Sequence, residues 1–134
     1  AAMELPDGQI VTGKTSALLG SSAALLLNAV KTLGHIPDDI HLIAPSFIEP
    51  IQKLKINYLG SKNPRLHTDE VLIALSMCAA TDANAQKALD QLSKLKGCQA
   101  HTSVILSRVD ISSFQKLGVD LTSEPIYEHT KVYH

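Results

Sequence analysis

The stretch GQIVTGKTSALLGSSAALLLNAVKTL, residues 8–33, decides the fold that this sequence predicts. It opens with a β-prone run at 9–12, directly after the turn signal Asp7-Gly8. A long run of small and apolar residues follows and stops at Gly34, a residue type that commonly ends helices. We therefore expect a first strand over about 9–12 and a helix over about 16–33.

Residues 8–15 of this stretch also match G-x-x-x-x-G-K-T, the pattern of the phosphate-binding P-loop. A P-loop needs a buried strand before its first glycine and a helix that opens at Lys-Thr. Here the preceding segment is short and carries Pro6, so we expect it to make a poor central strand. The β-prone run stands where the phosphate cradle should be. We therefore expect no ATP hydrolysis.

A weaker hypothesis survives for the same residues. They lie between an expected strand and an expected helix, and a helix N-terminus with a lysine beside it attracts anions. The candidate anion-binding residues in this segment are Gly13, Lys14, Thr15 and Ser16.

The rest of the chain continues the alternation of strands and helices. We expect a strand at 39–44, a helix from a Ser46/Glu49 capping box to about 58, a loop at 61–67, a helix at 69–80 capped by Thr68, a helix from Thr81 or Asp82 to 97, a strand TSVIL (102–106) within 98–107, a short helix at 111–117 and an extended segment at 120–126. This order predicts an α/β domain, layered around a largely parallel or mixed sheet.

Composition narrows the function classes. The 134 residues are enough for a single domain with a real core, and the net charge of -1 is spread without blocks of like charge. Neither nucleic acid nor a membrane is an expected partner, and no cofactor is expected. The two cysteines do not make a disulfide framework, so a cytoplasmic setting is the simplest expectation.

Two expected helices lack a polar face. SALLGSSAALLLNAV (16–30) and VLIALSMCAA (71–80) are small or apolar almost all round, which indicates burial on more than one side. In one interpretation, they are two central helices of a three-layer domain. The other has one of them pack against another domain or subunit, and both interpretations stay open.

Four strings carry a resemblance to a known family: LPDGQIVTGKTSALLG, SKNPRLHTDEVLIALSMCAAT, GCQAHTSVILS and LTSEPIYEH. Together they span most of the chain, which closely resembles the C-terminal region of a bacterial family called domain of unknown function 1846. The resemblance implies that residues 1–134 are a single domain, the last of a longer, multidomain parent. It also implies a three-layer α/β/α sandwich with a mixed, largely parallel sheet, similar in topology to the cytidine deaminases. Some relatives are labelled ATP-dependent peptidases, a label that the P-loop argument does not support.

A deaminase-like topology raises the question of zinc. That chemistry uses H-x-E with P-C-x-x-C, whereas this chain has His67-Thr68-Asp69-Glu70 and lacks P-C-x-x-C. His67 with Cys98 and His101 could supply three ligands, but residues three apart on a strand face opposite sides. We therefore expect no metal. In the alternative to a zinc site, Cys98 is a buried thiol and His101 is a polar histidine at the rim of the domain.

The loop before the 69–80 helix is the most informative stretch for function. It combines cationic and amide donors with carboxylates, which suits a polar or anionic small molecule. The candidate binding residues are Lys62, Asn63, Arg65 and His67, and the candidate catalytic residues are His67, Asp69 and Glu70. A solvated loop whose acids only cap the helix is the alternative.

The sequence therefore supports two hypotheses about function. In the first, the domain binds a small anionic or phosphorylated ligand where Lys14 and the 62–70 loop meet, and whether it is an enzyme stays open. In the second, it is a non-catalytic module that supports assembly with upstream domains or as a homo-oligomer.

Overall fold

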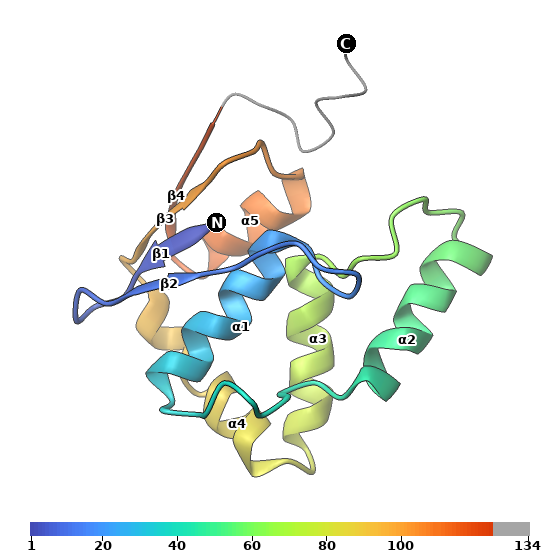
Figure 1. The fold of residues 1–134 in the computed structure, drawn as a ribbon, viewed down its shortest axis with the longest axis horizontal. Helices are drawn as coiled ribbons and strands as arrows, with labels where there is room; N and C mark the ends of the chain where they lie inside the picture. The colour runs from blue at the N-terminus through green and yellow to red at the C-terminus, as the bar shows by residue number, and fades with distance from the viewer. Residues whose placement is uncertain (125–134) are drawn as a thin grey trace.

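A four-stranded sheet forms one side of the molecule, as seen in the computed structural model, which describes residues 1–124 (Figure 1). Its strands are β1 Ala2–Glu4, β2 Ile10–Thr12, β3 Gln99–Thr102 and β4 Asp120–Ser123, in the spatial order β2-β1-β3-β4. β1 pairs antiparallel with β2 and with β3, and β3 pairs parallel with β4. The mixed α/β fold is thus confirmed, but the sheet is not largely parallel.

The antiparallel pairing begins with a tight hairpin. The Leu5 amide donates to the Gln9 carbonyl over 2.8 Å, and Gly8 adopts a φ of 87°, in the left-handed region that favours glycine. The Asp7 carboxylate accepts a hydrogen bond from the Gln9 amide at 3.0 Å. The expected turn at Asp7-Gly8 therefore reverses the chain between β1 and β2.

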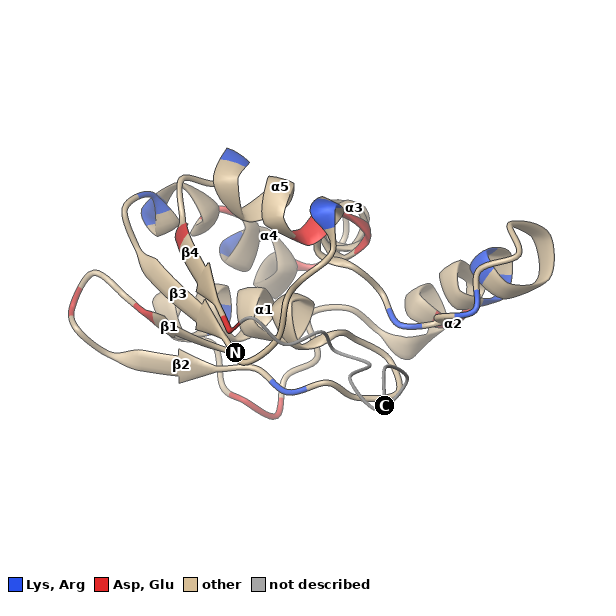
Figure 2. Ribbon diagram, turned by 90° about the horizontal axis from the view of Figure 1, so that it is seen from above, with Lys and Arg blue, Asp and Glu red and all other residues tan. Residues whose placement is uncertain are grey.

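Helices pack on one face of the sheet (Figures 1 and 2). The helical elements are α1 Ser21–Leu33, α2 Pro45–Lys53, the π-helical turn η1 Leu54–Tyr58, α3 Thr68–Ala79, α4 Ala83–Leu89, the 3₁₀ turn η2 Leu92–Leu95 and α5 Arg108–Lys116, of which α1 and α5 contact the strands most closely. Met3, Ala100 and Thr102 face these helices and are buried, whereas Glu4, Gln99 and His101 on the other face are more exposed. The described residues thus form two layers, and the expected third layer and deaminase-like topology stay predictions.

Gly13 allows β2 to end directly against α1. A Cβ at this position would lie 2.6 Å from the Ser21 carbonyl oxygen and closer still to the Leu25 backbone nitrogen. Only glycine fits such an approach of two backbones. The second glycine of the P-loop pattern is therefore explained by packing.

α1 begins at Ser21, so the expected start at residue 16 is wrong. The Ser16 hydroxyl accepts hydrogen bonds from the Leu18 and Leu19 amides, and the Ser16 amide donates to the Leu19 carbonyl at 2.9 Å. Ser16 thus closes a local turn, as serine side chains often do, and the helix starts after Gly20.

Three other expectations fail for local reasons. Residues 39–44 form a loop that buries Leu42 and Ile43, so their apolar character reflects burial in a loop. Residues before Pro6 form β1, which lies between two neighbours because Pro6 comes after the strand ends. α2 begins at Pro45 without a side-chain cap, so the expected capping box is absent there.

The remaining boundaries follow the sequence more closely. Asp82, one of the two expected starting residues, caps α4, but the helix expected to reach 97 ends at Leu89 and is followed by η2. α3 is capped by His67 where Thr68 was expected, and the 111–117 helix begins earlier, at Arg108. The strand expected at 102–106 is wrong in position, because β3 covers Gln99–Thr102 and residues 103–107 form a loop. The last extended segment is β4, and residues 125 and 126 of that expectation lie outside the described residues.

α2 and η1 project from the body as an arm, which we define as residues 45–59 (Figure 2). The arm is anchored by Ile48, which is buried, and by the Lys55 ammonium, which donates to the Arg65 carbonyl at 2.7 Å. The Gln52 amide group adds a hydrogen bond to the Ala17 carbonyl at 3.1 Å. The arm therefore joins the two loops that precede α1 and α3.

Candidate functional site

The two loops that the sequence singled out lie side by side. The Leu66 amide donates to the Leu18 carbonyl at 3.0 Å, and the Gly20 amide donates to the Leu66 carbonyl at 3.3 Å. The Arg65 guanidinium donates through Nε to the Ser16 carbonyl at 2.6 Å. Segments 13–20 and 60–67 thus form one surface, as the ligand-site hypothesis requires.

A narrow cleft opens where these loops lead into α1 and α3. Its volume of about 20 Å³ has room for about one water molecule. It is lined by Gly20, Ser21, Ser22, Asn63, Arg65, Leu66, His67, Leu106 and Asp110. Arg65, His67 and Asn63 are thus brought together, and a larger ligand would contact the cleft at its mouth.

The N-terminus of α1 forms one wall of this cleft. Gly20 occupies the cap position, where it offers no side chain, and the first turn contains no acidic residue. The first amides of a helix have no partner within the helix, and the helix dipole makes this end partly positive. Because Ser21 and Ser22 line the cleft, this wall suits an anion.

The cleft is also lined by Asp110, a buried carboxylate on α5. Its Oδ1 accepts hydrogen bonds from the Thr68 amide at 2.9 Å and the Thr68 hydroxyl at 2.6 Å. Its Oδ2 accepts from the Ser107 hydroxyl at 3.0 Å and lies 3.3 Å from Nδ1 of His67. Burial alone would raise the pKa of Asp110, but the hydrogen bonds from His67 and Thr68 lower it to about 2.

His67 is the titratable group that reaches the cleft from α3. Its side chain is 33% exposed, and Asp110 raises its pKa chiefly through their hydrogen bond, against the opposing effect of burial. A carboxylate only accepts hydrogen bonds, so Nδ1 carries the proton in this pair. Nε2 is then the ring atom left for a ligand or for water.

Glu70 stabilises the start of α3 and does not line the cleft. Its Oε1 accepts from the His67 amide at 2.8 Å and from the Lys55 ammonium at 2.9 Å. This geometry is a capping box completed by an ion pair, so both interactions fix the position of His67. Asp69 is exposed in the same turn and is also absent from the cleft lining.

Lys14, Thr15 and Lys62 lie near the cleft in sequence but do not line it. All three are exposed, Lys14 two residues before the Ser16 carbonyl that Arg65 contacts. The structure therefore brings together Asn63, Arg65 and His67, and it leaves the two lysines exposed outside the cleft lining.

Sequence reasoning missed Asp110, Ser22 and Lys55. Ser107 and Asp110 carry the signal of a helix start, because a Ser followed three residues later by an acid is typical of capping. Ser107 does cap α5, with its hydroxyl accepting from the Asp110 amide at 3.3 Å. What no local pattern could indicate is that the Asp110 carboxylate also contacts α3.

The zinc candidates lie apart. Cys98 is buried, while His101 lies on the exposed face of the sheet, 2.7 Å from the Thr122 hydroxyl. His67 pairs with Asp110 at the start of α3. Within residues 1–124, His, Cys, Asp and Glu side chains form no group of three or more that could hold a metal ion.

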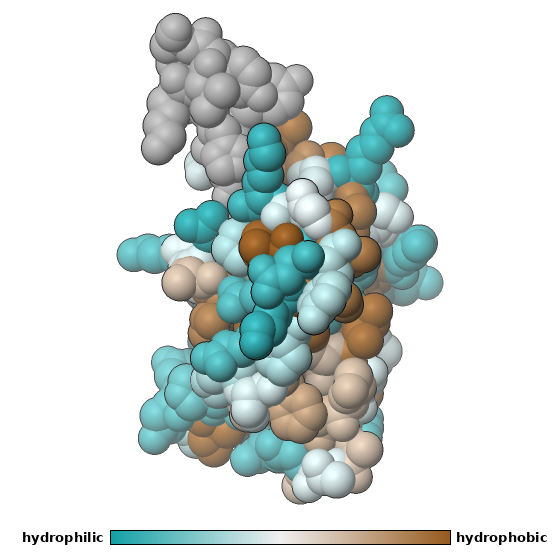
Figure 3. All heavy atoms as spheres, turned by 90° about the vertical axis from the view of Figure 1, so that its right-hand side faces the viewer, coloured by the Kyte–Doolittle hydropathy of each residue, from teal (hydrophilic) through white to brown (hydrophobic). Residues whose placement is uncertain are grey.

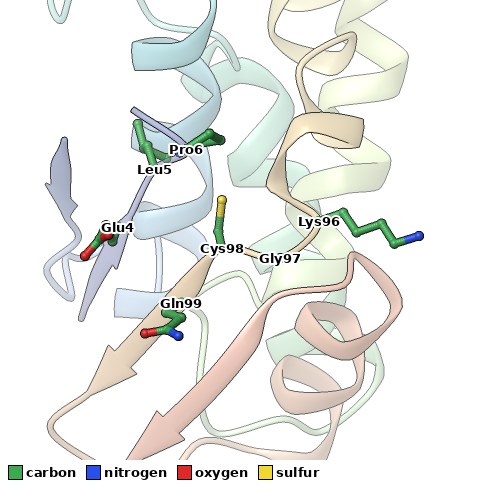
Figure 4. Close-up of a pocket in the computed structure, with 7 residues that line it drawn as sticks. All are labelled: Glu4, Leu5, Pro6, Lys96, Gly97, Cys98 and Gln99. Atoms are coloured by element: carbon green, nitrogen blue, oxygen red, sulfur yellow. The ribbon is translucent and has the colours of Figure 1, made fainter. Parts of the chain in front are cut away.

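Larger pockets lie away from the His67–Asp110 pair. One of about 320 Å³ lies where β1 ends and β3 begins, and Figure 4 shows the Cys98 thiol beside Leu5 and Pro6 there. Burial, with a smaller contribution from Glu4, raises the pKa of this thiol, so it stays protonated at neutral pH. Another, of about 470 Å³, covers the exposed face of the sheet beside His101.

No helix in the described part of the chain is long and apolar enough to cross a membrane.

The resemblance noted in the sequence is confirmed by comparison with known proteins. The chain belongs to the family described as "Domain of unknown function DUF1846, C-terminal", whose model matches residues 1–133. It is 61% identical over 132 residues to a UPF0371 protein of Corynebacterium diphtheriae, across 98% of this chain and 27% of the relative.

More distant bacterial relatives align over the same extent. A UPF0371 protein of Corynebacterium urealyticum is 59% identical over 133 residues, covering 99% of this chain and 27% of the relative. One from Streptococcus pyogenes serotype M3 is 52% identical over 132 residues, covering 98% of this chain and 27% of the relative. The chain thus spans about a quarter of the length of the curated relatives that it matches.

Proposed function

We propose that this chain, as a C-terminal domain of the family's longer proteins, contributes a binding site for a small anionic or phosphorylated molecule. The observation that carries the proposal is the cleft at the uncapped N-terminus of α1, which Arg65 and His67 also line. Helix amides, a guanidinium and an imidazole are the donors that phosphate and carboxylate groups prefer. Because the cleft holds about one water, the anionic group would bind at its mouth.

The surrounding loops supply the outer part of the proposed site. Lys14 and Lys62 are exposed on the two loops and would add favourable charge at longer range, while Asn63 lines the cleft. Gly13, Thr15 and Ser16 would act through the backbone that holds this surface, since Arg65 is fixed by the Ser16 carbonyl. If the site is catalytic, His67 is the favoured acid–base group, ahead of Asp69 and Glu70.

The test is stabilisation by inorganic phosphate and sulfate. A ligand that binds only the folded state at a hundred times its dissociation constant adds about 2.7 kcal/mol to the free energy of unfolding, which raises Tm. We expect this increment in Tm to shrink in Arg65→Ala, and to shrink less in Lys14→Ala and Lys62→Ala. The increment, taken within each variant, is independent of any destabilisation by the substitution itself.

Lys87→Ala is the matched control. Lys87 is an exposed cation on α4, at the far end of the helix bundle from the start of α1 (Figure 1). Lys87→Ala also removes one positive charge, but it does not change the cleft. The increment in Tm on adding phosphate or sulfate should therefore match that of the unmodified chain. Equal increments in Arg65→Ala and Lys87→Ala would exclude this site.

Assembly is the second candidate function, and the arm favours it. Large apolar side chains are exposed along it: Tyr58 is 77% exposed and Leu59 is 70% exposed. Phe47, Leu54 and Ile56 of the arm and Ile73 and Met77 of α3 are also exposed. Figure 3 faces this side and shows apolar surface between the polar side chains. Such a concentration is typical of protein contact surfaces.

This alternative predicts a homo-oligomer. Light scattering after size exclusion should then give a dimer or larger species, and Tyr58→Ser with Leu59→Ser should return it to a monomer. A monomer across the micromolar range would exclude self-association through the arm. Ile10→Ser, which changes an exposed residue of β2, is the control that should leave the mass unchanged.

The three-layer, deaminase-like arrangement remains part of the proposal for the full-length protein. One face of the sheet is exposed among the described residues, so a further layer has a place to pack. The side chains there include Glu4, Gln99 and His101, which favour a polar contact over a large apolar one. A structure of a full-length relative tests this directly.

A further inference from the structure

We propose that the mouth of the cleft binds a tetrahedral dianion of the phosphate or phosphomonoester class, and that binding is coupled to protonation of His67, which Asp110 holds in place. This inference rests on the proposed anion site and specifies its ligand class and its regulation. Three observations on the described residues carry it: the charges around the cleft, the orientation of the imidazole, and the donors that surround the mouth.

The fixed charges around His67 cancel. Lys55 on η1 and Arg65 in the loop are cationic, while Glu70 on α3 and Asp110 on α5 are anionic. Lys55 is paired with Glu70, and Asp110 is buried among its donors. Among these four groups the formal charges sum to zero, so a second proton on the imidazole of His67 makes the set net positive, and the exposed Lys14 and Lys62 add to that charge at longer range.

The hydrogen bond to Asp110 decides what that proton does. With Nδ1–H directed to the carboxylate, 3.3 Å away, Nε2 of the neutral ring is an acceptor with a lone pair, which repels an oxyanion. Protonation converts Nε2 into a donor. The change therefore occurs at the one ring atom left for a ligand, on a side chain that lines the cleft and is 33% exposed.

The remaining donors define the ligand class. The first amides of α1 point along the helix axis toward its N-terminal end, beside Ser21 and Ser22, and Arg65 approaches from the other loop. Helix amides, a guanidinium and a protonated imidazole together offer more donors than a planar carboxylate, which two donors satisfy, and they therefore favour a tetrahedral group with several charged oxygens. The proton on His67 then balances the second negative charge of the dianion.

Sulfate is the probe, because it stays a dianion throughout the neutral pH range and its own titration does not enter. Isothermal calorimetry of the folded chain at a series of pH values should show affinity that falls about tenfold per pH unit once His67 loses its proton. Titration in buffers of different ionisation enthalpy should show uptake of close to one proton at the upper end of that range.

Reciprocity gives a second measurement that needs no variant. If sulfate binds the protonated ring more tightly, sulfate must raise the pKa of His67, which proton NMR of the ring measures directly. The ring signals of His101 are an internal control, since this residue lies on the sheet face and should not respond to sulfate. His67→Gln, which keeps a polar side chain without a titratable proton, should bind with a flat pH dependence and at least tenfold weaker at low pH.

The outcomes separate the two proposals. Sulfate that binds near Arg65 with the same affinity from acid to alkaline pH would overturn the proton coupling and leave the anion site intact. No binding at any pH would overturn both. Affinity that falls with pH in the natural chain, and not in His67→Gln, supports the coupling.

Discussion

Nδ1 of His67 lies 3.3 Å from Oδ2 of Asp110, so the residue that caps α3 is paired with a carboxylate 43 positions later in the chain. The same carboxylate binds the Thr68 amide and hydroxyl, and the Ser107 hydroxyl that caps α5. One buried group therefore fixes the starts of two helices and the tautomer of an accessible imidazole. Function and stability depend on the same contact here.

The stability of the domain should fall in acid as Asp110 takes up a proton. Its pKa is lowered from 3.8 to about 2, so its contribution is present above the unfolded value and is lost as pH falls from about 4 toward 2. The contribution amounts to up to about 2 kcal/mol. Urea unfolding at several pH values between 2 and 6 measures it.

His67 acts in the opposite direction. Because its pKa is raised in the folded chain, its contribution is present below the unfolded value near 6.5 and is lost as pH rises through the folded value. Asp110→Asn keeps the shape of the side chain. In a plot of the free energy of unfolding against pH, it should flatten both the fall in acid and the fall at higher pH where His67 loses its proton. A variant profile that retains the fall in acid would assign that fall to other carboxylates.

The local parts of this arrangement could be predicted from the sequence. Apolar runs located α1 and α3, the Asp7-Gly8 turn was placed correctly, and the start of α4 was narrowed to Thr81 or Asp82. These signals depend on residues within a few positions of one another. The loop at 60–67 was selected for its mixture of donors, and its contact with the 13–20 loop is observed.

The other parts depend on contacts between distant residues. β1 has only three residues, too few for an alternation pattern, and it is a strand because β2 and β3 pair with it on both sides. Residues 39–44 have strand-like composition, but no neighbouring strand pairs with them. Asp110 joins the site because α5 starts beside α3, a relationship that only the folded chain creates.

Gly13→Ala should destabilise the domain without removing any polar contact. The added methyl group would meet the α1 backbone at Ser21 and Leu25, which cannot move away as a flexible side chain could. Overpacking of this kind costs about 1–3 kcal/mol. Lys14→Ala changes the exposed neighbour and should stay within about 0.5 kcal/mol of the natural chain. Equal thermal stability of the two variants would refute the packing role of Gly13.

The domain should not hydrolyse ATP. β2 occupies the centre of the P-loop pattern, and α1 begins at Ser21, six residues after the Lys-Thr pair, so no helix opens where the phosphates would bind. Release of inorganic phosphate from Mg-ATP should therefore equal the buffer blank. Turnover that disappears in Lys14→Ala would show that this argument fails.

Lys55→Ala should loosen the arm. The Lys55 side chain is 9% exposed. Its ammonium donates to the Arg65 carbonyl at 2.7 Å and to the Glu70 carboxylate at 2.9 Å, and so joins η1 to the loop and to α3. Losing these charged hydrogen bonds should cost about 1.5–3 kcal/mol, and amide hydrogens across α2 and η1 should exchange faster with solvent. Lys53→Ala is the matched control, because Lys53 is exposed two positions earlier. If both variants exchange at the same rate across the arm, then Ile48 and Gln52 are its main attachment and Lys55 is not.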